Sequence, residues 1–208
     1  MLIDHIFIIS NCRKEADELV DFGMTEGSGR VHQGIGTANR RFFFDNFYLE
    51  ILWVENELEA RSVKDIGIWE RSDYRNSGYS PYGLCLRNSE DTNRIFENSI
   101  KWKPAFLSEG GHVDIITSDK MPWIFRFPSN RHKNISDEPK VHKAGIKRLS
   151  EAIFNLSEKE FGNILDSISD NSIIEFRKAL TNSLVLEFDN AEKGKSETFE
   201  NFNLVIKY

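Results

Sequence analysis

The first ten residues of the chain alternate weakly between apolar and polar side chains, as is typical of a β-strand, and the pattern then changes period. Residues 13–22 carry apolar side chains at helical spacing, and Gly23 follows, where glycine commonly ends a helix. Turn residues then separate runs of strand-forming side chains. Three more strands are therefore expected, near residues 23–30, 37–44 and 47–54. Residues 1–56 are predicted to form one βαβββ module.

A degraded second copy of this order of elements follows at residues 81–128. Its elements are expected as a strand at 82–88, a helix at 91–102, and strands near 112–117 and 122–127. Residues 57–80 lie between the two copies and are rich in Glu and Arg. They are predicted to form a helical bridge.

A third copy is expected at residues 146–208. Its elements are a strand at 146–156, a helix that begins at a capping box after Ser157 and runs to Ile168, and strands at 172–178, 183–189 and 199–207. Repetition of one supersecondary unit is a strong architectural signal. A lone βαβββ module exposes one face of its sheet, so two modules must pair to bury it. We predict an α+β fold of repeated βαβββ modules, whose curved mixed sheets pair around a cleft.

Composition narrows the class of protein. Hydrophobic residues make up 39% of the chain and charged residues 29%, which is typical of a soluble globular protein. The net charge is −6 and the basic residues are scattered, so no nucleic-acid partner is expected. The apolar runs are too short to span a membrane, and the N-terminus lacks the basic leader of a signal peptide. Cys12 and Cys85 are expected as free thiols, which indicates a reducing compartment and a cytoplasmic location.

Two titratable side chains interrupt the apolar faces of predicted strands. Strand side chains alternate between faces, so His5 shares a face with Phe7, and Glu50 shares one with Leu52. Such a group is costly to bury unless it is paired or coordinated. If both strands line one cavity, the imidazole and the carboxylate converge, which suits a divalent metal or acid–base catalysis. The alternatives are a core histidine bonded to a backbone carbonyl, and an ion pair between Glu50 and an arginine.

The glycine-containing segment before the strand at 37–44 offers candidate ligand contacts. Gly34 and Gly36 are expected in a turn that needs positive φ, where backbone N–H groups are also able to approach a ligand oxygen. His32 precedes the glycines and is the histidine of this segment expected to face a ligand. Asn39 is open to two interpretations, a turn cap and a ligand contact. The segment lacks the lysine and the strand–loop–helix setting of a nucleotide-binding loop.

A family resemblance is carried by three motifs of the first module: Asp4-His5, His32-Gln33-Gly34-Ile35-Gly36-Thr37-Ala38-Asn39, and Tyr48-Leu49-Glu50. In this order they resemble the glyoxalase-like branch of the vicinal oxygen chelate superfamily, which includes glyoxalases, bleomycin resistance proteins and dihydroxybiphenyl dioxygenases. The resemblance covers residues 1–157 and is specific in the first module. It is weaker from Met121 to Phe127 and at His142.

The resemblance implies a small-molecule cleft and chemistry next to a carbonyl, of the lyase or isomerase type. In that scheme His5 and Glu50 bind a divalent ion (zinc, nickel, manganese or iron), and Glu50 is also the catalytic carboxylate. A dioxygenase-like iron site is a variant that needs a second histidine, such as His32 or His142. The substrate-binding residues are then expected to be His32, Gly36, Asn39, Trp123 and Arg126.

The second module departs from this pattern at both expected ligand positions. Members of the superfamily usually take metal ligands from two paired modules. Here Tyr82 stands at the expected position of His5, and Arg126 at that of Glu50. Arg126 is therefore expected either to bind an anionic group of the ligand or to pair with Glu50.

Two other functions follow from this departure and from the exposed edges of the predicted sheets. One is a metal-free protein that binds a small aromatic or anionic molecule between aromatic walls, expected to be Phe42, Phe44, Trp53 and Trp123. The other is a structural module that forms a homodimer through its sheet edges.

Overall fold

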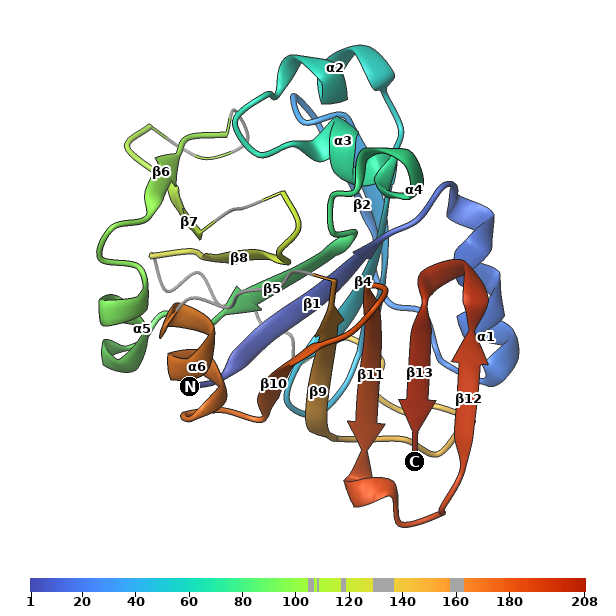
Figure 1. Ribbon diagram of the computed structural model, residues 1–208. Helices are drawn as coiled ribbons and strands as arrows, with labels where there is room; N and C mark the ends of the chain where they lie inside the picture. The colour runs from blue at the N-terminus through green and yellow to red at the C-terminus, as the bar shows by residue number, and fades with distance from the viewer. Residues whose placement is uncertain (105–106, 108, 117–118, 129–136, 158–162) are drawn as a thin grey trace.

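Two mixed β-sheets form the framework of the protein (Figure 1). The computed structural model describes the whole chain except residues 105–106, 108, 117–118, 129–136 and 158–162. Within these described residues, one sheet has eight strands and the other has five, with short helices around them. The α+β class predicted from the sequence is confirmed. Within the described ranges, no helix is long and apolar enough to cross a membrane.

The first module has the predicted order of elements. They are β1 (Ile3–Ile9), a 3₁₀ turn (Arg13–Ala16), α1 (Asp17–Phe22), β2 (Arg30–His32), β3 (Thr37–Phe43) and β4 (Tyr48–Val54). Gly23 ends α1 with a left-handed φ of 108°, as its place after the helical run predicts. The bridge that follows consists of α2 (Glu57–Ser62), α3 (Ile68–Ser72) and α4 (Tyr74–Ser77).

The second module also follows the βαβββ order. Its elements are β5 (Tyr82–Leu86), α5 (Glu90–Ile95), β6 (Ile100–Trp102), β7 (Val113–Ile116) and β8 (Trp123–Arg126). The predicted helix at 91–102 is too long, because the chain leaves helical geometry at Phe96 and returns to the sheet as β6. Thr92 closes the capping box with Ser89 that starts α5.

The two modules join edge to edge in the eight-stranded sheet. The strand order is β2-β3-β4-β1-β5-β8-β7-β6, so the first strand of each module lies at the centre. β1 pairs parallel with β4 and antiparallel with β5, and β5 pairs parallel with β8. The connectivity of the first module is thus repeated in the second.

The third segment forms the five-stranded sheet with a different strand order. Its elements are β9 (Leu149–Leu156), α6 (Asn163–Ser169), β10 (Ile174–Lys178), β11 (Ser183–Phe188), β12 (Ser196–Phe199) and β13 (Leu204–Lys207). The order is β10-β9-β11-β13-β12, with β10 parallel to β9 and β13 parallel to β11. The single strand predicted at 199–207 is divided by a turn at Asn203, which adopts a left-handed φ of 46°. The predicted boundaries stay predictions, at 1–56, 57–80, 81–128 and 146–208.

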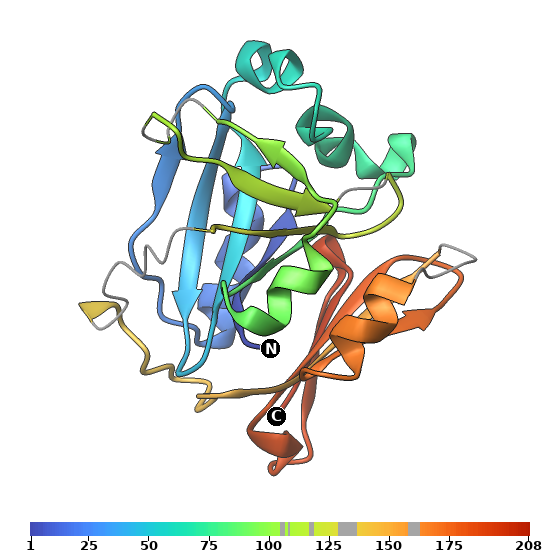
Figure 2. The ribbon, with the colours of Figure 1, turned by 90° about the vertical axis from the view of Figure 1, so that its left-hand side faces the viewer.

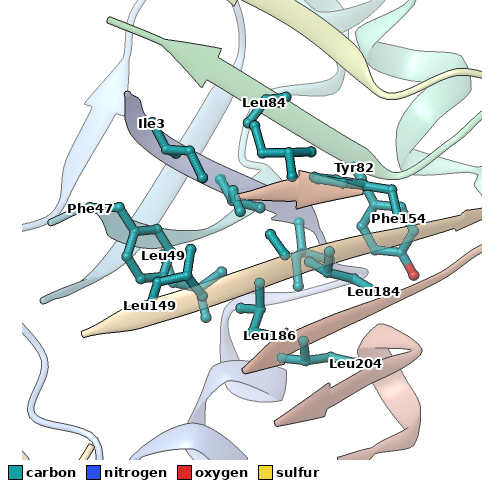
Figure 3. Close-up of a cluster of buried hydrophobic side chains, with 14 of the residues drawn as sticks. Ile3, Phe47, Leu49, Tyr82, Leu84, Leu149, Phe154, Leu184, Leu186 and Leu204 are labelled. Atoms are coloured by element: carbon teal, nitrogen blue, oxygen red, sulfur yellow. The ribbon is translucent and has the colours of Figure 1, made fainter. Parts of the chain in front are cut away.

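The five-stranded sheet packs against one face of the eight-stranded sheet, as a separate layer in two perpendicular views (Figures 1 and 2). The close-up in Figure 3 shows Leu49 and Leu84 from the first layer facing Phe154 and Leu184 from the second. Each such fully buried side chain contributes about 1.5–3 kcal/mol. Covering this face leaves the opposite face of the eight-stranded sheet as the place for a ligand.

His142 belongs to the connection between the layers rather than to a ligand site. Its side chain is 5% exposed; Nε2 donates to the carbonyl of Phe43 at 2.9 Å, and Nδ1 accepts from the backbone N–H of Thr25 at 2.9 Å. Both ring nitrogens of His142 are thus bonded to the backbone within the fold. The second histidine of an iron site therefore cannot be His142.

Burial lowers the pKa of His142, although its bond to Phe43 acts in the opposite direction. A folded-state pKa below the unfolded value of 6.5 favours the neutral ring in the folded protein. This contribution to stability is complete above pH 6.5 and is lost as the pH falls toward the folded-state pKa, at no more than about 1.4 kcal/mol per pH unit. Urea unfolding from pH 7.5 to 5 should show a shallower loss in His142→Gln than in the parent chain. Equal slopes in both proteins would contradict this role.

Candidate functional site

A cavity of about 550 Å³ lies on the uncovered face of the eight-stranded sheet. Alternation along β1 and β4 directs His5, Phe7 and Glu50 into it. The cavity therefore spans the seam between the two modules, where β1 and β5 pair. Its walls come from both modules and from the bridge, which contributes Ile68.

The two principal sequence candidates converge in this cavity. His5 is 5% exposed and Glu50 is 6% exposed. Nε2 of His5 lies 3.6 Å from Oε2 of Glu50, which agrees with the expected convergence of the two strands. Their roles as metal ligands, and that of Glu50 as a catalytic carboxylate, stay predictions.

Asp4 orients the imidazole of His5. Its Oδ1 lies 2.7 Å from Nδ1 of His5. An ionised carboxylate only accepts hydrogen bonds, so the neutral ring carries its proton on Nδ1. Nε2 then presents a lone pair toward Glu50. In this neutral form, two acceptor atoms face each other across 3.6 Å. The sequence analysis gave Asp4 a place in a motif but no role in the site, because alternation along a strand assigns Asp4 and His5 to opposite faces.

A chain of polar groups continues from Glu50 toward β2. The side-chain amide of Asn39 donates to Oε1 of Glu50 at 2.5 Å and lies 3.4 Å from Nε2 of His32. Nδ1 of His32 is 2.9 Å from the hydroxyl of Thr37. Burial lowers the pKa of His32, and the charge of Glu50 opposes that effect only in part. The structure therefore brings His32, Asn39 and Glu50 into one hydrogen-bonded row.

Gly36 serves the turn and does not line the cavity among the described residues. Its φ is +75°, and a Cβ there would lie 2.3 Å from the carbonyl oxygen of Asn56. Glycine is required at this position by a left-handed conformation and by close backbone packing. This corrects the expectation of a substrate contact; Ile35 lines the cavity instead.

The second module presents Gly83 and Phe125 at the positions that correspond to His5 and Glu50. Cross-strand register sets Phe7 opposite Gly83 and His5 opposite Cys85. The expected equivalents, Tyr82 and Arg126, point to the other face of the sheet. The expected equivalents were displaced by one residue on each strand. A shift of one residue moves every side chain of a strand to the opposite face of the sheet.

Tyr82 and Arg126 both have partners away from the cavity. The hydroxyl of Tyr82 donates to the carbonyl of Phe202 at 3.1 Å, in the layer below. Nε of Arg126 donates to Oδ2 of Asp114 at 3.0 Å, and another guanidinium nitrogen donates to the hydroxyl of Thr92 at 2.9 Å. Arg126 therefore neither pairs with Glu50 nor faces a ligand, which corrects both expectations.

Aromatic rings form the half of the cavity that the second module contributes. Trp123 and Phe125 stack with ring centroids 5.0 Å apart, and Phe7 meets Trp123 edge-on at 5.6 Å. Trp102 lies on the far side of Trp123, at 5.8 Å. Trp123 lines the cavity as predicted. The other expected aromatic walls do not: Phe42 and Phe44 lie in the core between the sheets, and the Trp53 indole bonds to Glu55.

The donor set fits a complete protein-held metal site poorly. His5 and Glu50 are spaced for one ion, but Gly83 and Phe125 offer no donor where the second module would supply ligands. Asp4, His5 and Cys85 do place donor atoms within 4.8 Å of one another. Without a bound ion, burial raises the pKa of the Cys85 thiol well above its usual value.

Comparison with known proteins identifies the first part of the chain. Residues 3–98 match the model of the family described as glyoxalase-like domain, so the chain contains a glyoxalase-like domain. No curated protein matches the chain.

Solved structures extend the likeness of the fold. A hypothetical protein from Staphylococcus aureus superposes with a TM-score of 0.62 at 14% identity, covering 99% of this chain and 97% of that chain. At this identity the likeness shows the fold alone. Methylmalonyl-CoA epimerase, in complex with methylmalonyl-CoA and NH4+, gives a TM-score of 0.44 at 15% identity, over 62% of this chain and 95% of that chain.

Proposed function

We propose that this chain binds a small molecule in the cavity and that binding needs no protein-held metal. The division of the cavity into two halves carries the proposal. Asn39, Glu50 and His5 provide hydrogen-bonding groups on one side, and the rings of Trp123 and Phe125 provide a flat apolar surface on the other. A few convergent polar groups beside an apolar wall are typical of small-molecule sites.

The metal-free character rests on the second module. An ion held between His5 and Glu50 would gain no ligand from Gly83 or Phe125, which stand at the corresponding positions of the second module. The ring of Phe7 fills the space above Gly83, where a second ligand side chain would project. Elemental analysis of the purified protein should find well under one divalent ion per chain. One ion per chain in the parent protein, lost in His5→Ala, would overturn this part of the proposal.

Ligand binding is testable through the indole rings. Small ring-bearing compounds should shift the NMR signals of the Trp102 and Trp123 indole N–H groups and leave that of Trp53, which lies outside the cavity. Trp123→Leu should weaken binding about tenfold. A lost contact between aromatic rings costs about 0.5–1.5 kcal/mol of binding free energy in addition to the loss of buried apolar surface. Trp53→Phe is the matched control and should bind as the parent does. A screen that perturbs none of the cavity indoles would contradict a binding function.

A second candidate function is proton transfer next to a ligand carbonyl, of the isomerase or lyase type. The observation that favours it is the alignment of Asp4, His5 and Glu50, in which the carboxylate of Asp4 leaves Nε2 of His5 free to accept a proton. This activity predicts uptake of solvent deuterium beside a carbonyl of a bound compound, abolished in His5→Gln. Binding without any exchange would leave the chain as a binding protein. A homodimer stays a prediction.

A further inference from the structure

Glu50 is a buried carboxylate without an arginine or lysine partner among the described residues. Its side chain is 6% exposed. Its hydrogen bond comes from the neutral amide of Asn39, and the ionisable group within ion-pair reach is His5. Burial of an uncompensated carboxylate is costly. A cationic group delivered by a ligand would offset that cost.

Three arginines line the cavity, and none of them forms an ion pair with Glu50 among the described residues, although Arg41 is its cross-strand neighbour. Arg41 donates to the carbonyl of Ser28 at 2.6 Å and lies over the Phe43 ring. Arg87 donates to the carbonyl of Asn46 at 3.4 Å. Arg30 is exposed on the edge strand β2. With Arg126 on the opposite face, no guanidinium within the described ranges reaches Glu50.

The surroundings of Glu50 suit a cation in two ways. When the His5 ring is neutral, Nε2 of His5 and Oε2 of Glu50 are both acceptors, and a donor with several hydrogens can serve both. Aromatic rings also lie beside this pair: Tyr48 stacks on His5 at 4.5 Å, Phe125 meets His5 edge-on at 5.4 Å, and Phe7 is a cross-strand neighbour of Glu50. Ring faces attract cations, most strongly where water is excluded.

Building on the function proposed above, we propose that the ligand carries a protonated amine that binds between Glu50 and His5. Its apolar body then lies on Trp123 and Phe125. The chemical class is a small amine with an attached ring. An ammonium group donates charge-assisted hydrogen bonds to a carboxylate, which are stronger than neutral ones. Glu50 is the specificity-determining residue in this arrangement.

Three probes that share one ring separate charge from shape: benzylamine, benzyl alcohol and phenylacetate. Each is titrated at pH 7 in the presence of EDTA, followed through the Trp102 and Trp123 indole signals. Benzylamine should bind about tenfold more tightly than benzyl alcohol, which corresponds to about 1.4 kcal/mol, and phenylacetate should bind most weakly. Glu50→Gln should remove the preference for the amine and retain binding of benzyl alcohol. Glu187→Gln, a matched charge change on β11, should keep the preference.

The outcomes distinguish this inference from the function on which it rests. If all three probes bind with equal affinity, or phenylacetate binds most tightly, the amine site is wrong and the cavity still binds ligands. A preference for benzylamine that survives in Glu50→Gln also overturns it. If no probe perturbs the cavity indoles, the binding function itself fails.

Discussion

Replacement of Gly83 by alanine should destabilise the protein by about 2–3 kcal/mol, the upper range for an overpacked core position. A Cβ on Gly83 would lie 1.9 Å from Cε1 and 2.1 Å from Cζ of Phe7. The ring of Phe7 is 2% exposed and is held against Trp123 and Phe125, so it has little room to move. Urea unfolding followed by circular dichroism measures the change.

Removal of the Phe7 ring tests whether its clash with the added Cβ causes the loss of stability. In a Phe7→Leu background, Gly83→Ala should lower the free energy of unfolding much less, because leucine has no atoms at the position of the ring edge. Gly78→Ala provides a second comparison, because Gly78 ends α4 with a φ of +76° and has no atom within 4 Å of an added Cβ, whereas Gly83 lies within the strand β5. That change should cost about 1 kcal/mol, the strain of the left-handed conformation. Equal losses for Gly83→Ala with and without the Phe7 ring would refute the packing argument.

Arg126→Met should lower the free energy of unfolding by about 3–5 kcal/mol, the range for removing one partner of a buried ion pair. Asp114 is 2% exposed, and Arg126 provides its buried guanidinium partner at 3.0 Å. The guanidinium also holds α5 to the sheet through Thr92 and Asn93. Thermal and urea unfolding should both show the loss.

Two further variants identify the role of Arg126. Arg126→Met combined with Asp114→Leu should recover most of the lost stability, because no buried charge is then left alone. Arg126→Glu should create no zinc, nickel or manganese site that depends on Glu50, because the new carboxylate would face Asp114 rather than Glu50. Divalent-metal binding by Arg126→Glu in titration calorimetry that is lost when Glu50→Gln is added would place this side chain in the cavity; binding that persists without Glu50 would be assigned to Asp114 and His112.

The local periodicity of the sequence was sufficient for most of the first module; the exception is its edge strand, expected near 23–30 and found at Arg30–His32. The helical spacing before Gly23 and the alternation in β1 and β4 are properties of neighbouring residues, so they predict these elements without knowledge of the fold. The same alternation places His5 and Glu50 on one face of the sheet. Their convergence in one cavity follows once β1 and β4 pair in parallel.

Only the tertiary structure decided which residues of the second module correspond to His5 and Glu50. The choice between Tyr82 and Gly83, and between Phe125 and Arg126, depends on the register of the second module, and a displacement of one residue reverses the face of a strand. Apolar residues on both faces of β5 and β8 conceal that register in the sequence. The contact of Gly83 with Phe7 joins strands that are far apart in the chain. Pairing across that distance is set by the packing of whole layers, which local sequence patterns do not contain.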